Sequence, residues 1–177
     1  NGYKVEVVEK NSKADAVNRL FFMNLGGYQS NVFEELHYKM LMVADEKAVA
    51  VHIRRGDYLK PTVNAFHGLL PIEYYENAKV KLETTIDHPN YYIFSDDIEW
   101  CKLNFKFRNS TFISDKGTAN WEDMCLMSLC KHNIIANSSY SWWSAWLNTN
   151  PNKIVIAPEQ WFVKQTSEIV PEKWLKI

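Results

Sequence analysis

The sequence lacks the features that mark several large protein classes. Its 177 residues include three cysteines, an odd number without the paired spacing of a zinc site, so we expect free thiols in a reducing compartment. It has no internal repeat and no low-complexity tract. The formal net charge of -1 gives no global attraction toward nucleic acid or an anionic membrane. Any bound anion must therefore be held by a local cluster of side chains.

Long apolar runs and several catalytic signatures are also missing. The longest apolar runs, such as 21–25 and the stretch near Trp142, are far too short to span a membrane. No signal peptide opens the chain, and an expected strand at 3–8 lies almost at its start, after Asn1 and Gly2, so we expect that an N-terminal region is missing. The absence of a GxxxxGK loop, a glycine-rich dinucleotide fingerprint and a nucleophile elbow argues against the enzyme classes that these motifs define.

The chain does contain a regular alternation of secondary structure from Lys47 onward. A hydrophobic content of 46% is enough for one substantial core. Short apolar runs predict strands at 48–53, 91–95, 111–114, 133–136 and 154–157, and helices are expected between them at 71–86, 97–104, 120–130 and 141–148. This pattern predicts an α/β fold, a Rossmann-like parallel sheet with helices on both faces.

Two regions of the chain differ in regularity. Residues 47–177 are expected to form the Rossmann-like domain, whereas residues 1–46 are expected to be a linker and the remnant of a preceding region, with a turn at 26–30 and a helix at 31–44. In a parallel sheet the ligand lies beyond the carboxyl ends of the strands. The polar segments 52–58, 95–97 and 137–143 each follow such an end, so we expect them to converge on one site.

Two adjacent arginines follow the first strand of the domain. Arg54 and Arg55 offer planar charged groups that match diphosphate oxygens, and Gly56 permits a tight turn or a close approach of the backbone to a ligand. Because alternate residues of a strand face opposite sides, we expect one arginine to reach the ligand and the other to brace a carboxylate such as Asp57. The alternatives are a surface ion pair with Asp57 and an adhesion motif at 55–57.

Hydroxyl groups and carboxylates complete the expected site. Asn137, Ser138, Ser139 and Tyr140 precede a helix, whose N-terminus suits a phosphate group, although simple capping by Ser139 or Ser141 is the alternative. The indoles of Trp142, Trp143 and Trp146 are expected to pack in the core, and a platform for a sugar is the alternative. Ser95, Asp96 and Asp97 either cap a helix or accept hydrogen bonds from a ribose, base or sugar. Neither carboxylates nor histidines show metal-ligand spacing, so we predict no metal and no cofactor.

The heptad at 52–58, HIRRGDY, resembles the HxRRGDY signature of the alpha-1,2-fucosyltransferases, glycosyltransferase family 11. Further blocks resemble that family in the same order, at 70–75, 93–100, 122–128, 137–143, 153–158 and 161–162. The resemblance covers about 27–162, with a departure at 26–30, where the family usually has an aromatic residue between the Tyr and the Gln. Several ordered blocks are more specific than any single motif.

The resemblance implies the C-terminal half of a GT-B glycosyltransferase that binds GDP-fucose. The implied reaction is metal-independent, inverting transfer of L-fucose to the 2-hydroxyl of a terminal galactose in a glycan, a polysaccharide or a lipid-linked precursor. We expect a bacterial cytoplasmic enzyme with at most peripheral membrane association and no nucleic-acid partner. The alternatives are a fucosyltransferase of another linkage, a GDP-binding domain inactive in transfer, and a structural or adhesive domain.

The resemblance also assigns roles to individual residues. Arg54 would bind the diphosphate and neutralise charge as GDP leaves. Arg54 and Asp57 are the two predicted catalytic residues. Asp57 and His67 are the candidate general bases. The substrate-binding set is His52, Arg54, Arg55, Ser95, Asp96, Asp97, Asn137, Ser138, Ser139 and Tyr140.

Overall fold

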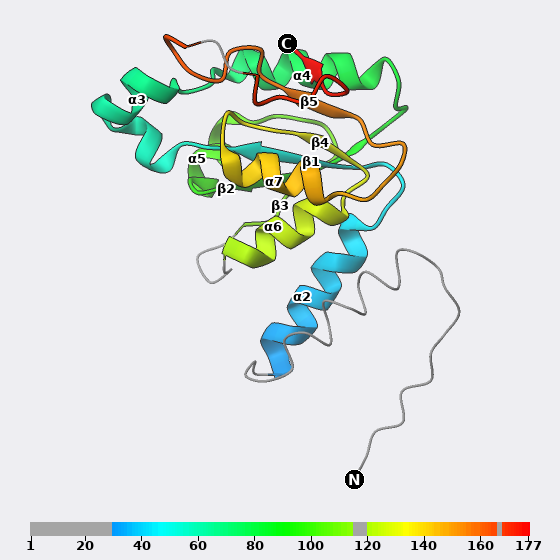
Figure 1. Ribbon diagram of the computed structural model, residues 1–177. Helices are drawn as coiled ribbons and strands as arrows, with labels where there is room; N and C mark the ends of the chain where they lie inside the picture. Colours follow the sequence, from blue (N-terminus) through cyan, green and yellow to red (C-terminus); the bar gives the residue numbers. More distant parts are fainter. Residues whose placement is uncertain (1–29, 115–119, 166–167) are drawn as a thin grey trace.

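The computed structural model describes residues 30–114, 120–165 and 168–177 (Figure 1). The described residues form one six-stranded sheet in the order β3-β2-β1-β4-β5-β6, with every neighbouring pair parallel. This is the strand order of the Rossmann fold, so the predicted fold class is confirmed. The strands are β1 (Ala48–Ile53), β2 (Asn90–Ser95), β3 (Ser110–Phe112), β4 (His132–Ile134), β5 (Val155–Ala157) and β6 (Leu175–Lys176).

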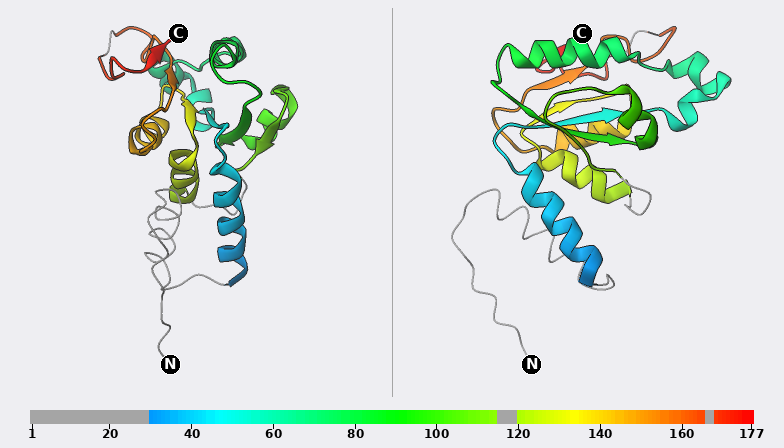
Figure 2. Two further views of the ribbon diagram at one scale, coloured as in Figure 1. Left: turned by 90° about the vertical axis from the view of Figure 1, so that its right-hand side faces the viewer. Right: turned by 180° about the vertical axis from the view of Figure 1, so that it is seen from behind.

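Helices cover both faces of the sheet (Figure 2). Because side chains alternate along a strand, Val49 and Val51 of β1 pack against α4 and α5, whereas Ala48 and Ala50 pack in the cluster formed with α2 and α6. α7 packs beside α6 and covers β5. The helices are α2 (Ser30–Val43), the 3-10 helix η1 (Gly56–Leu59), α3 (Pro61–His67), α4 (Ile72–Glu83), α5 (Ile98–Asn104), α6 (Asn120–Leu129) and α7 (Ser139–Leu147).

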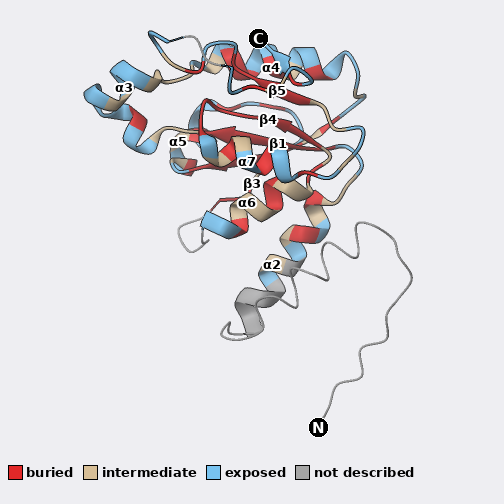
Figure 3. Ribbon diagram, viewed as in Figure 1, coloured by how far each residue is buried: buried red, intermediate tan, exposed pale blue. Residues whose placement is uncertain are grey.

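The central strands form the most buried layer of the protein (Figure 3). All six residues of β1 are buried, which explains why a continuous apolar run marks this strand in the sequence. Cys101 and Cys130 are also buried in the core, where desolvation raises the pKa of the Cys101 thiol to about 11. Within the described ranges, no helix is both long and apolar enough to cross a membrane.

Three short elements were not predicted from the sequence. β6 has only two residues, both exposed, so no apolar pattern marks it. η1 and α3 fill the segment 56–67, and α3 projects beyond the sheet (Figure 1). None of the α3 residues is buried, which leaves no amphipathic signal, and only Pro61 at the first turn favours a helix start.

The N-terminal part of the chain joins the core through the end of α2. Met40 and Val43 are buried in the cluster that includes α6. The boundary expected at residue 47 remains a prediction. The strand expected at 3–8 lies outside the described residues, and so does the turn at 26–30 except for Ser30, which begins α2.

The sheet order fixes where a ligand can lie. The chain runs outward from β1 to β2 and β3 on one side, and from β4 to β5 and β6 on the other. In such a sheet, the crevice at the carboxyl ends of the two strands where the order reverses is the usual ligand site. Here these strands are β1 and β4, which are followed by Arg54 and by the segment 135–138.

Candidate functional site

A pocket of about 430 Å³ lies at the carboxyl ends of β1 and β4. It brings together residues that follow β1, β2 and β4, as the three polar segments of the sequence predict. The starts of α6 and α7 complete its wall. The residues that line it are His52, Arg54, Asp57, Tyr58, His67, Ser95, Asp96, Asn120, Asp123, Ser138, Ser139 and Tyr140.

The guanidinium group of Arg54 lies in this pocket between two carboxylates. Its Nη2 is 2.6 Å from Oδ1 of Asp57, and its Nη1 is 2.8 Å from Oδ2 of Asp96. The side chain of Arg54 keeps 30% of its surface exposed. The arginine is thus held in a fixed orientation while part of its fork of donors stays accessible to a ligand.

Asp96 binds two consecutive residues of the loop after β1 and lies close to the third, Gly56. Besides the ion pair with Arg54, its Oδ1 accepts a hydrogen bond of 2.9 Å from the backbone N–H of Arg55. A Cβ atom on Gly56 would lie 2.3 Å from Oδ2 of Asp96. The close approach that the glycine permits is therefore an approach to this carboxylate, and the loops after β1 and β2 are locked together.

Arg55 turns away from the pocket. Its Nε lies 3.0 Å from Oδ2 of Asp97, and its guanidinium carbon lies 3.5 Å from the ring centre of Trp100 on α5. The two arginines therefore differ in role, as strand geometry predicts, but Arg55 braces Asp97 and not Asp57. Neither Arg55 nor Asp97 is among the pocket-lining residues, so the structure gives them positions that support the site from behind.

Asp97 and Ser138 occupy the N-cap positions of α5 and α7, but neither side chain forms a capping hydrogen bond among the described residues. Asp97 is the N-cap residue of α5, yet its carboxylate bonds to Arg55, and the Ser95 hydroxyl accepts the Asp97 N–H at 3.0 Å. Ser138 is the N-cap of α7, and among the described residues its hydroxyl forms no capping bond. Ser138 and Ser139 face the pocket at the N-terminus of this helix, where backbone N–H groups favour an anion.

Asn137 was predicted to bind substrate, but the structure does not bring its side chain into the pocket. It is 2% exposed, and its amide donates hydrogen bonds to the carbonyl oxygens of His67, Gly68 and Trp161. The backbone carbonyl of Asn137 accepts a hydrogen bond of 2.9 Å from the Tyr58 hydroxyl. Asn137 thus fastens the end of α3 to the end of β4.

His52 is a buried, uncharged member of the pocket wall. Burial and the nearby Arg54 charge lower the pKa of its imidazole to about 3. Within the described part of the chain, its Nδ1 has no hydrogen-bond partner. The ring of Tyr140 lies 5.3 Å away, and the Tyr140 hydroxyl donates to the Asn120 carbonyl. His52 therefore acts at neutral pH as a neutral donor or acceptor and not as a cation.

Sequence reasoning did not assign binding roles to Tyr58, Asn120 or Asp123, although all three line the pocket. Asp123 lies in the first turn of α6 and accepts a hydrogen bond from the Ser114 hydroxyl. That hydroxyl also accepts the backbone N–H of Ser95 at 3.0 Å. The only sequence signal for Asp123 is its place in the family-like block 122–128.

The three tryptophans of α7 do not share one environment. Trp142 packs against Trp174 and donates its indole N–H to the Ile169 carbonyl at 2.9 Å, as core packing predicts. Trp143 and Trp146 are 50% and 53% exposed, so the core expectation is wrong for them. Across the described residues, no three His, Cys, Asp or Glu side chains are grouped so that they could hold a metal ion.

One known protein family matches most of the chain. The profile described as Glycosyl transferase family 11 matches residues 25–177, which is most of the sequence. The chain belongs to glycosyl transferase family 11. The family match includes every segment that lines the pocket, from His52 to Tyr140.

Among curated proteins, the O-antigen biosynthesis glycosyltransferase WbnK of Escherichia coli is 39% identical over 152 residues, covering 83% of this chain and 50% of that protein. The alpha-1,2-colitosyltransferase of Escherichia coli is 43% identical over 141 residues, covering 73% and 47%. Human galactoside alpha-(1,2)-fucosyltransferase 1 is 31% identical over 103 residues, covering 56% and 28%. The chain thus spans about half the length of the first two relatives and less than a third of the length of the human one.

A solved structure is also similar to this chain. It is the crystal structure of NodZ alpha-1,6-fucosyltransferase soaked with GDP-fucose, which is 15% identical, with a TM-score of 0.48 and coverage of 82% of this chain and 49% of that one.

Proposed function

We propose that this chain forms the donor-binding part of an enzyme that transfers L-fucose from GDP-fucose to the 2-hydroxyl of a galactose unit. The observation that carries the proposal is the arrangement of Arg54 and the N-terminus of α7 around one pocket at the β1–β4 switch point. A diphosphate between them would meet a planar cation and the positive end of a helix. Family membership supports glycosyl transfer as the reaction.

We propose that the diphosphate and the base occupy separate parts of the pocket. Arg54, Ser138 and Ser139 would supply the donors for phosphate oxygens. The base would lie against Tyr140, whose ring centre is 5.3 Å from that of His52 and which lies near Asp123. The carboxylate of Asp123 is suited to guanine, whose Watson–Crick edge presents two adjacent N–H donors, whereas adenine presents only one donor group there. We therefore propose guanosine as the nucleoside of the donor.

Arg54 has the central role in the proposed transfer. The acceptor oxygen forms a bond to the anomeric carbon as the bond from that carbon to the diphosphate oxygen breaks, and the electron pair leaves with GDP. The positive charge of Arg54 stabilises the charge that develops on the leaving diphosphate, so the transfer needs no metal ion. The acceptor hydroxyl gives its proton to Asp57 or His67, both of which line the same pocket.

Two substitutions test the role of Arg54 with matched chemistry. Arg54→Ala should weaken GDP binding by about 1.5–3 kcal/mol, because it removes charged hydrogen bonds to phosphate. Arg108→Ala is the control, since Arg108 is exposed and precedes the amino end of β3, away from the pocket. Equal GDP affinities of the two folded variants, measured by titration calorimetry, contradict the assignment.

Transfer of colitose is the second candidate, because one curated relative named for that transfer is 43% identical to this chain. The two candidates share the guanosine diphosphate site and differ in the sugar that the pocket accepts. Incubating the enzyme with equal amounts of GDP-linked fucose and GDP-linked colitose, followed by analysis of the transferred sugar and its linkage, separates them. A product with another linkage contradicts the alpha-1,2 assignment in both cases.

A further inference from the structure

A cluster of aromatic rings borders the pocket on the side of α3. Tyr58 and His67 stack with ring centres 4.8 Å apart, and Phe66 meets His67 edge-on at the same distance. Phe162 lies 5.0 Å from Phe66 and 5.6 Å from His67. We call Tyr58, Phe66, His67 and Phe162 the aromatic rim. Two segments that are far apart in the sequence thus combine into one cluster of rings, of which Phe66 is the exposed member.

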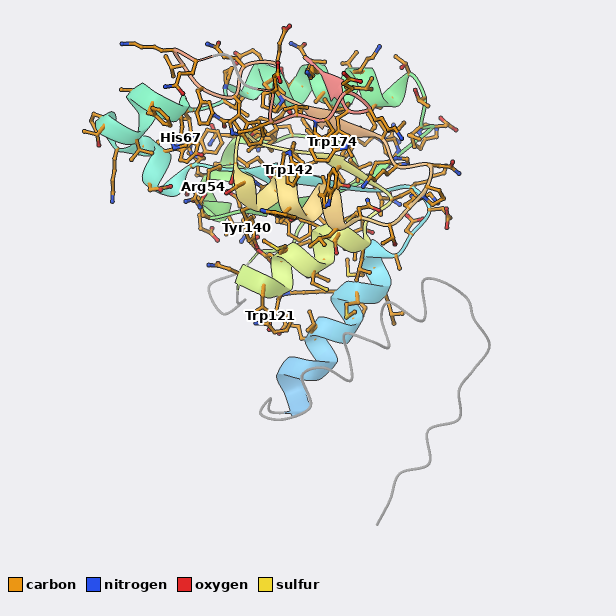
Figure 4. The ribbon with its side chains drawn as sticks, in the orientation of Figure 1. Arg54, His67, Trp121, Tyr140, Trp142 and Trp174 are labelled. Atoms are coloured by element: carbon orange, nitrogen blue, oxygen red, sulfur yellow. The ribbon has the colours of Figure 1, made fainter. Side chains whose placement is uncertain are left out.

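The aromatic rim is continuous with the pocket. Tyr58 and His67 line the pocket, and the Tyr58 ring centre is 5.5 Å from the guanidinium carbon of Arg54. Phe66, at the outer side, is 46% exposed, and Val163 beside it is 41% exposed. His67 and Arg54 lie at the same end of the molecule (Figure 4). Ring contacts therefore link Tyr58, which lies beside Arg54, through His67 to the exposed Phe66.

The aromatic rim is held in place before any ligand binds. The Phe66 carbonyl accepts the backbone N–H of Val163 at 3.0 Å, which joins α3 to the segment after Trp161. The Asn137 amide holds the carbonyls of His67 and Gly68. Gly68 has a φ of +76°, a left-handed conformation that favours glycine, and it turns the chain back from α3. Such pre-ordering lowers the entropic cost of binding.

We propose that the aromatic rim binds a pyranose ring of the acceptor. A pyranose has an apolar face of C–H groups and an edge of hydroxyls, which suits an exposed ring next to polar side chains. Phe66 provides the exposed ring, whereas Asp57 and His67 provide polar atoms at the pocket edge. This inference rests on the proposed function, because it places the acceptor beside the sugar that leaves the Arg54-bound diphosphate.

Saturation-transfer NMR on the GDP-bound protein tests the proposal, with methyl β-D-galactopyranoside as the probe at millimolar concentration. We expect signals on the C–H protons of one sugar face for the wild type. Phe66→Ala and Phe66→Leu should reduce them at least fivefold, and Phe66→Tyr should keep them. The control is Val80→Ala on α4, because Val80 is 63% exposed and does not line the pocket.

The outcomes separate this proposal from the function on which it rests. Loss of the sugar signal in Phe66→Ala with unchanged GDP affinity and melting temperature supports the aromatic rim as the acceptor site. Equal sugar signals in the wild type and in Phe66→Ala contradict it, as does the absence of any sugar signal while GDP binds. If GDP itself does not bind the wild type, the proposed function fails first, and the aromatic rim has no acceptor role.

Discussion

Nη1 of Arg54 lies 2.8 Å from Oδ2 of Asp96, an ion pair that joins the loop after β1 to the loop after β2. The same carboxylate binds the Arg55 backbone and occupies the space that a side chain at position 56 would need. We propose that Arg54 binds the diphosphate of the donor. Its orientation therefore depends on a residue that follows a neighbouring strand, and this dependence can be measured.

Replacement of Gly56 by alanine should displace the Asp96 carboxylate. The added Cβ would lie 2.3 Å from Oδ2 of Asp96, so we expect a loss of about 1–3 kcal/mol in stability from overpacking and weaker GDP binding. Urea denaturation and calorimetry measure the two effects. Gly56→Ala combined with Asp96→Ala removes the clash, so the double variant should be more stable than the sum of the single effects. Additive effects contradict this explanation of Gly56.

The contacts of Arg55 with Asp97 and Trp100 should stabilise the same loop. Its guanidinium carbon is 3.5 Å from the Trp100 ring centre, and such contacts contribute about 0.5–2 kcal/mol. Trp100→Phe should keep most of this stabilisation, whereas Trp100→Leu should lose it while retaining an apolar side chain. A double-mutant cycle with Arg55→Met, followed by urea denaturation, isolates the contact. A coupling energy near zero would show that the stacking has no role.

Asn137 should be required for the position of α3. Its amide donates to three carbonyls, so Asn137→Asp removes these donors with little change in shape and adds charge. We expect a loss of at least about 2 kcal/mol and faster amide exchange in α3 than in α4. Hydrogen exchange followed by mass spectrometry provides the measurement. Unchanged exchange in α3 would contradict the fastening role.

His52 predicts a specific pH dependence of stability. Its pKa is about 3 in the folded protein, below the ordinary value of 6.5, so the unfolded chain binds more protons between these values. Its contribution is complete above pH 6.5 and is lost as the pH falls toward 3, by up to about 1.36 kcal/mol per pH unit.

The test of this pH dependence is urea denaturation at several pH values between 4.5 and 7.5. His52→Gln cannot titrate and should show a shallower decline than the wild type. Some decline should remain, because burial also lowers the pKa of His132. Parallel declines of the wild type and His52→Gln would show that His52 is not buried in its neutral form.

The sequence was sufficient for the fold wherever burial leaves a pattern. The run AVAVHI predicts β1 with its observed bounds because every residue of that strand is buried. α3 and β6 leave no such pattern, since none of their residues is buried. Their positions depend on tertiary contacts, such as the bonds from Asn137 to the end of α3.

The location of the pocket was predictable from the sequence, but not every side chain that lines it. The sheet rule places the segments after β1, β2 and β4 together, and the pocket lies there. The strand pattern does not distinguish Arg54, which faces the pocket, from Arg55, which stacks on Trp100, and only the family resemblance singled out Arg54. Asp123 also depends on tertiary structure, because only the packing of α6 against the sheet brings its carboxylate to the pocket.

The most direct measurement is calorimetric titration of this chain with GDP and, in parallel, with ADP, each with and without EDTA. We expect that GDP binds, that ADP binds at least tenfold more weakly, and that EDTA changes neither affinity. Equal affinities for the two nucleotides, or loss of GDP binding in EDTA, would contradict a metal-independent guanosine diphosphate site built on Arg54 and Asp123.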